Sequence, residues 1–82
     1  KVKGDSMEPR LYEGDLVVVK MEVEPNNKEA GVFITSDGDT VVKIYNVLAD
    51  GRKVLTSLNP LYPPITDDFH IVGKVWKVLG GW

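Results

Sequence analysis

Short runs of β-branched residues separated by turn signals are the feature that most constrains how this chain can fold. Five such runs predict strands: Asp15–Lys20, Gly31–Ser36, Thr40–Leu48, Arg52–Thr56 and Phe69–Leu79. The dipeptides Asp37-Gly38 and Asp50-Gly51 separate consecutive runs and suit the positive φ angles of tight hairpin turns. The pattern predicts a mainly all-β fold, with hairpins curled into a compact, partly open barrel.

Two local features qualify this all-β prediction. Gly4–Leu11 has room for one turn of helix, which Ser6 could cap. Gly73 interrupts the last strand and is a candidate bulge or bend. No segment carries a 3.6-residue apolar period over three helical turns.

Length and composition narrow the function classes. The 82 residues are enough for one domain, 1–82, and 43% hydrophobic with 27% charged residues is ordinary globular composition. The net charge of −2, with lysines and arginines scattered singly, argues against direct binding of nucleic acid. The absence of cysteine and the single histidine, His70, exclude cysteine metal sites and a zinc site with several histidines. We expect no metal and no cofactor. No apolar run approaches the ~18 residues of a membrane span.

Lys43 stands in the middle of a run whose two faces are both mainly apolar. One face carries Val41, Lys43, Tyr45 and Val47, and the other carries Val42, Ile44, Asn46 and Leu48. Two ordinary explanations are an ammonium that reaches water along its apolar stem, or a lysine on an exposed sheet edge. The alternative is a desolvated lysine with a lowered pKa, which can take a proton from a serine hydroxyl.

Three serines are candidate partners for such a lysine. Ser36 and Ser57 adjoin turns, where serine commonly has a structural role. Ser6 lies in Gly4-Asp5-Ser6-Met7-Glu8-Pro9, where backbone N–H groups could converge on an oxyanion, although a helix N-cap is the simpler interpretation. A Ser–His–Asp triad would need His70, which sits in a β-rich run and is more simply structural or solvent-facing.

Four ordered motifs resemble the family of LexA, UmuD and phage-repressor peptidases, known as S24. They are Val2–Pro9 with Glu13–Val19, Val41–Tyr45, Leu58–Ile65 and Ile71–Val75. Together they span nearly the whole chain, and the 37 residues from Ser6 to Lys43 suit the serine–lysine spacing of that family.

The resemblance implies a catalytic dyad in a mostly-β, LexA C-terminal-domain-like fold. Ser6 would be the nucleophile and Lys43 its general base, with the N–H groups of Asp5 and Ser6 as oxyanion donors. Met7 would pack beneath the nucleophile, and Gly14-Asp15 would form a turn. The substrate would be the chain's own upstream segment, commonly cut at Ala-Gly or Cys-Gly, so we do not expect residues 1–82 to cleave themselves in cis.

The resemblance also implies partners and a cellular setting. It predicts a homodimer, with Phe69–Leu79 and Trp76 as its apolar surface unless Trp76 fills the core. It further implies a cytoplasmic repressor of the SOS type, triggered by a RecA-like filament, that contacts DNA through an N-terminal domain outside this sequence. The chain begins at Lys1 without a methionine, so we expect it to be a piece of a longer protein.

Three alternatives stay open at this point. A non-catalytic dimerisation module would keep the fold and lose cleavage. A UmuD-like polymerase accessory protein would carry a short upstream arm in place of a DNA-binding domain. A type I signal peptidase is disfavoured because neither a membrane anchor nor a Gly-x-Pro-Gly-Asp box after the lysine is present.

Overall fold

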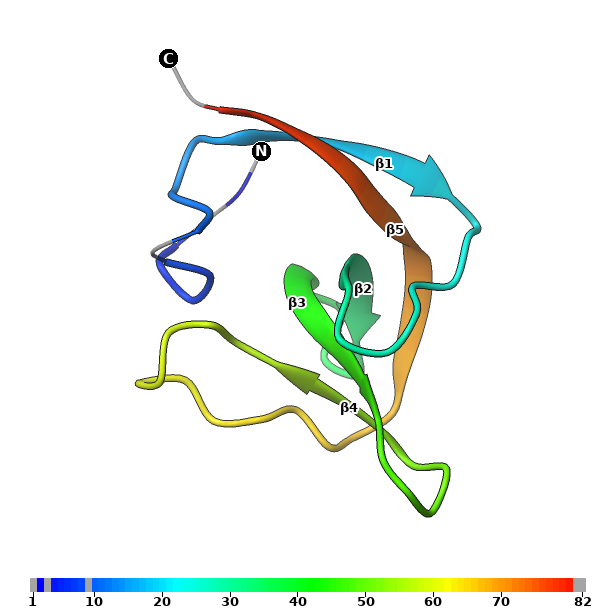
Figure 1. The fold of residues 1–82 in the computed structure, drawn as a ribbon. Helices are drawn as coiled ribbons and strands as arrows, with labels where there is room; N and C mark the ends of the chain where they lie inside the picture. The colour runs from blue at the N-terminus through cyan, green and yellow to red at the C-terminus, as the bar shows by residue number, and fades with distance from the viewer. Residues whose placement is uncertain (1, 3, 9, 81–82) are drawn as a thin grey trace.

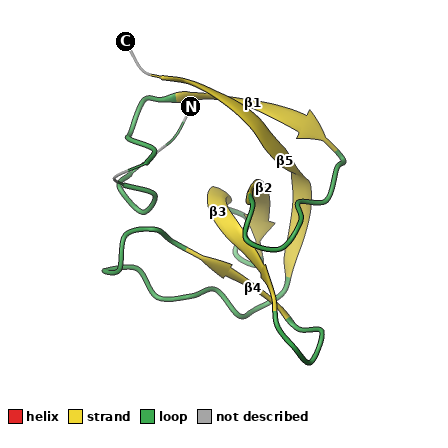
Figure 2. Cartoon of the chain, in the orientation of Figure 1, coloured by secondary structure: helices red, strands yellow, loops and turns green. Residues whose placement is uncertain are grey.

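The computed structural model describes residues 2, 4–8 and 10–80, and strands are its only regular elements within that part of the chain (Figure 2). The strands are β1 (Leu16–Met21), β2 (Ala30–Thr35), β3 (Thr40–Val47), β4 (Lys53–Thr56) and β5 (Phe69–Gly80). Each begins and ends within one residue of the segment predicted for it. The all-β prediction is confirmed. Across the described residues, no helix offers the length and apolar character that a membrane crossing requires.

The five strands form one antiparallel sheet in the order β1-β5-β2-β3-β4. The sheet curls strongly, so that the turns before β1 come to lie beside the loop that follows β4 (Figure 1). The edge strands β1 and β4 do not pair with each other, which leaves the curl open on one side. This arrangement matches the predicted partly open barrel.

The two Asp-Gly dipeptides form hairpin turns in which only the glycine has a positive φ. Gly38 has φ 90° and Gly51 has φ 88°. Asp37 keeps a negative φ, so the β2–β3 turn is wider than a two-residue hairpin, and the Thr35 amide donates to the Asp39 carbonyl at 2.8 Å. Glycine is placed where a side chain would strain the left-handed backbone.

The predicted irregularity at Gly73 is confirmed as a bulge. On β2, Val32 pairs with Gly73 and Phe33 pairs with Ile71, which leaves Val72 as the extra residue of β5. A Cβ atom on Gly73 would lie 2.3 Å from the Lys20 carbonyl oxygen of β1. Only glycine therefore lets β5 approach β1 this closely at this point.

Residues 4–8 and 10–11 form turns and bends and not a helix. A single helix-like bond runs from the Leu11 amide to the Met7 carbonyl at 3.0 Å. The segment is anchored by Val2, whose amide and carbonyl bond to Asp15 and Gly14 at 2.9 and 2.8 Å. The expected helical turn is thus limited to this one bond, and residues 12–15 lead on to β1.

Both faces of β3 pack against apolar side chains, as the two-sided pattern predicted. One cluster consists of the buried residues Val2, Met7 and Leu11 with the partly buried Val17, Val42, Ile44 and Leu58. The other consists of the buried residues Phe33, Tyr45 and Leu55 with the partly buried Val41, Ile65, Phe69 and Ile71. Because β3 separates these clusters, its central lysine is enclosed by protein.

Candidate active site

Lys43 is buried in the described structure, with 7% of its surface exposed. β3 lies between β2 and β4, so the interpretation of Lys43 as an edge lysine is wrong. Its amine donates a hydrogen bond to the Ser57 hydroxyl at 2.6 Å and lies 5.4 Å from the centre of the Tyr62 ring. Burial lowers the pKa of the Lys43 ammonium below its ordinary value, because desolvation disfavours the charged form. The amine therefore loses its proton more readily than that of a solvated lysine.

Ser57 is a hydrogen-bond partner of Lys43 that the sequence did not predict. Antiparallel pairing of β3 with β4 sets Ile44 opposite Thr56, and one further step along the same register sets Lys43 opposite Ser57. The Asp50-Gly51 turn could have predicted this proximity, because the register of the hairpin determines which residues of its two strands face each other. Considered alone, the sequence around Ser57 predicts only a residue beside a turn.

Ser6 lines a groove of about 660 Å³. The groove is lined mainly by aliphatic side chains of β1, β2 and β3, including Val17, Val19 and Val32. Ser6 is half-buried, and Met7 beside it is only 2% exposed and packs with Val2 and Leu11. The predicted role of Met7 as packing beneath the serine is confirmed.

The loop after β4 contacts both the serine turn and the lysine. The Asn59 amide donates to the Ser6 carbonyl at 2.8 Å, and the Asn59 side chain donates to the Asp5 carbonyl at 3.1 Å. The Tyr62 hydroxyl donates to the Asp5 carboxylate, while the ring of Tyr62 faces Lys43. Residues 57–62 thus contact both the turn that carries Ser6 and the Lys43 side chain.

The structure does not join Ser6 and Lys43 directly. Within the described residues, the Lys43 amine is hydrogen bonded to Ser57 and not to the Ser6 hydroxyl. The Asp5 and Ser6 amides donate to no group in the part of the chain that the structure describes. These N–H groups, predicted as oxyanion donors, lie on the turn beside the groove.

The other candidates of the sequence lie elsewhere. Ser36 is exposed in the turn between β2 and β3, which agrees with a turn role. His70 is exposed on β5 opposite Ile34 and does not line the groove at Ser6. Gly14 has φ 89° and forms the predicted turn with Asp15. Among residues 2, 4–8 and 10–80, no three histidine, aspartate or glutamate side chains gather as metal ligands would.

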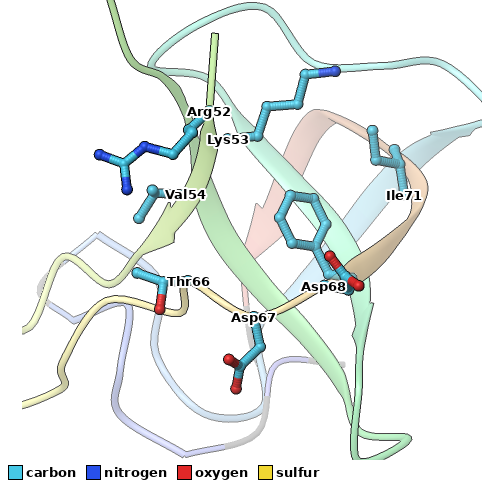
Figure 3. A pocket seen from close by; sticks show the side chains of 8 residues that line it. Arg52, Lys53, Val54, Thr66, Asp67, Asp68 and Ile71 are labelled. Atoms are coloured by element: carbon cyan, nitrogen blue, oxygen red, sulfur yellow. The ribbon is translucent and has the colours of Figure 1, made fainter. Parts of the chain in front are cut away.

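A second hollow, of about 400 Å³, lies between β4 and the start of β5. Figure 3 shows that the charged ends of Arg52, Lys53 and Asp67 point away from one another instead of converging. The Arg52 guanidinium is paired with Asp50 at 2.8 Å, on the surface. This hollow lacks the convergent polar groups of a catalytic site.

The chain is similar to LexA repressors over most of its length. The chain is 34% identical over 76 residues to the LexA repressor of Bacillus cytotoxicus. The matched region covers 92% of this chain and 37% of that protein. The LexA repressors of Bacillus mycoides and Bacillus anthracis are each 33% identical over 76 residues, with the same coverage. The chain thus spans 37% of the length of these curated relatives. A profile of the family described as Peptidase S24-like matches residues 1–76, and the chain belongs to this family.

Proposed function

We propose that this chain is the self-cleaving and dimerisation domain of a cytoplasmic LexA-type repressor, with Ser6 as nucleophile and Lys43 as general base. The observation that carries the proposal is a buried lysine of lowered pKa, held by the same loop that binds the serine turn. Membership of the S24-like family and the LexA repressors among its relatives support the same reaction.

The proposed reaction begins with proton transfer from the Ser6 hydroxyl to the neutral Lys43 amine. Ser6 Oγ then attacks the scissile carbonyl carbon, and the N–H groups of Asp5 and Ser6 stabilise the oxyanion. When the C–N bond breaks, the Lys43 ammonium returns the proton to the leaving amine. Water hydrolyses the resulting ester with Lys43 again as base.

The proposed substrate is a segment of the same protein that precedes residue 1. It would enter the groove at Ser6, whose aliphatic lining suits the small apolar residues on the amino side of an Ala-Gly or Cys-Gly bond. Binding of DNA would belong to an N-terminal domain outside this sequence, and a RecA-like filament would trigger cleavage.

Homodimerisation is proposed through the second half of β5. From Val75 onward β5 pairs with β1 alone, because its pairing with β2 ends at Lys74. Trp76 is 60% exposed there, so the alternative that it fills the core is wrong. Val78 and Leu79 are exposed beside it, and a partner strand would cover this apolar segment.

One observation favours a second candidate, a dimerisation module without catalysis. The Lys43 amine is bonded to Ser57, and the proposed reaction needs it to meet the Ser6 hydroxyl as well. In a non-catalytic module this serine and lysine would only stabilise the fold.

Self-cleavage of the longer protein separates the two functions. We expect the wild type to cut itself more quickly as the pH rises, because the neutral amine is the active form. Ser6→Ala and Lys43→Ala should abolish cleavage while circular dichroism shows an intact fold, and Ser36→Ala, in an exposed turn, should cleave normally. A folded wild type that stays intact, or a Ser6→Ala variant that still cuts, would support the non-catalytic module.

A further inference from the structure

We infer that Ser57 is a positioning residue for the proposed base: its hydroxyl holds the Lys43 amine at one place in the buried site. This role deepens the proposed function and rests on it, because Ser57 would act on the reaction only through Lys43. It concerns the one hydrogen bond that Lys43 makes through its side chain among the described residues.

The contact lies at the end of the β3–β4 pairing. Ser57 is the first residue after β4, and the last pair of the two strands, Ile44 with Thr56, directly adjoins Lys43 and Ser57. The donor–acceptor distance is 2.6 Å, and Ser57 is half-buried. The Tyr62 ring lies 5.4 Å from the same nitrogen. The amine is thus restrained by a hydroxyl and by an aromatic face.

A serine hydroxyl is suited to this role because it can accept a hydrogen bond from lysine in both protonation states. The ammonium has three N–H donors and the neutral amine has two, so either form can keep one bond to Ser57. Without this acceptor, the four-carbon stem of Lys43 would regain rotamer freedom inside the site. Displacement of a catalytic group by about 1 Å costs on the order of 100-fold in rate.

The hydroxyl also acts on the protonation of Lys43. As an acceptor it favours the ammonium, so its removal should lower the pKa of Lys43 further. Tyr62 faces this amine, Asp5 accepts a hydrogen bond from the Tyr62 hydroxyl, and Lys74 of β5 is paired with Gly31 of β2, which is also the partner of Lys43. The hydrogen bond from Tyr62 to Asp5 raises the pKa of Tyr62, which keeps that ring neutral across the tested range, and Lys74 is paired with Glu29 at 3.1 Å.

The test compares Ser57→Ala, Ser57→Thr and the control Ser36→Ala in the longer protein. The self-cleavage rate is measured against pH. We expect Ser57→Ala to lower the plateau rate roughly 10- to 100-fold and to move the inflection to lower pH. Ser57→Thr, which keeps the hydroxyl, should restore most of the rate, and Ser36→Ala should match the wild type. Mere loosening of the fold would admit water and move the inflection to higher pH.

A second measurement does not depend on cleavage. In a Ser6→Ala background, the pKa of Lys43 is read from its side-chain ¹³Cε resonance, assigned with Lys43→Ala. Ser57→Ala should lower the pKa of Lys43, and Ser57→Thr should not. If the Ser57→Ala variant fails to fold, Ser57→Cys is used in its place, because a thiol is a weaker hydrogen-bond partner than a hydroxyl. An unchanged pKa together with a wild-type cleavage rate in Ser57→Ala would overturn the inference alone. Absence of cleavage in the wild type would overturn the proposed function, and with it the positioning role.

Discussion

Replacing Met7 by alanine tests whether the serine turn is held by the core beneath it. Met7 is 2% exposed and lies among Val2, Leu11 and the aliphatic side chains on one face of β3. Truncating a buried methionine to alanine costs about 2–5 kcal/mol, from lost burial and the cavity left behind. A domain of 82 residues has a free energy of unfolding on the order of 4–12 kcal/mol. Met7→Ala should therefore remove a large share of the stability.

Urea unfolding at fixed protein concentration measures this loss. With about 4–8 °C of melting temperature per kcal/mol, the thermal midpoint should also fall by at least ~8 °C. Met21, the other methionine of the chain, is 65% exposed on β1 and is the matched control. Met21→Ala should change the free energy of unfolding by less than ~0.5 kcal/mol. Equal effects of the two substitutions, or a loss below ~1 kcal/mol for Met7→Ala, would refute this account of the turn.

Three further predictions concern the bulge, the dimer and DNA. Gly73→Ala should destabilise the domain by more than ~1 kcal/mol in urea unfolding, because its Cβ would meet the Lys20 carbonyl at 2.3 Å; unchanged stability would contradict the bulge geometry. Val78→Asp should convert a homodimer to monomers in analytical ultracentrifugation without unfolding it, whereas Val47→Asp, on β3, should leave the dimer intact; a wild type that is monomeric at ~100 µM would contradict the dimer. The chain should not shift duplex DNA at about 0.15 M salt, because its net charge of −2 provides no clustered phosphate contacts; a band shift at micromolar protein would contradict this.

The strands were predictable from the sequence because each one combines β-branched residues with a turn signal at its end. The sheet order was not predictable in the same way, since β5 inserts between β1 and β2 through contacts that span much of the chain. The connection between β1 and β2 was also beyond prediction. Glu22 and Lys28 adopt positive φ angles of 60° and 73° there, and neither residue type signals that conformation.

The candidate site was predictable in part. The two-sided apolar pattern of Val41–Leu48 left a buried Lys43 open beside a lysine that reaches water or lies on a sheet edge. Its burial follows from the two clusters that enclose β3. Ser57 was missed because serine after a strand most often serves a turn, and its hydrogen bond to Lys43 emerges only when the hairpin register is extended by one residue. Contacts of Asn59 and Tyr62 with Asp5 depend on the curl of the whole sheet, which no local pattern encodes.

The most direct test of Lys43 as the general base compares the pH dependence of the cleavage rate in the wild type and in Lys43→Arg. A longer protein carrying Ser6→Ala serves as substrate, and this chain is added in trans. The rate should rise with pH until the lowered pKa of Lys43 is passed. Lys43→Arg should be inactive throughout, because a guanidinium stays protonated at any usable pH. A rate that ignores pH between about 6 and 9, or cleavage by Lys43→Arg, would contradict the assignment of Lys43 as the base.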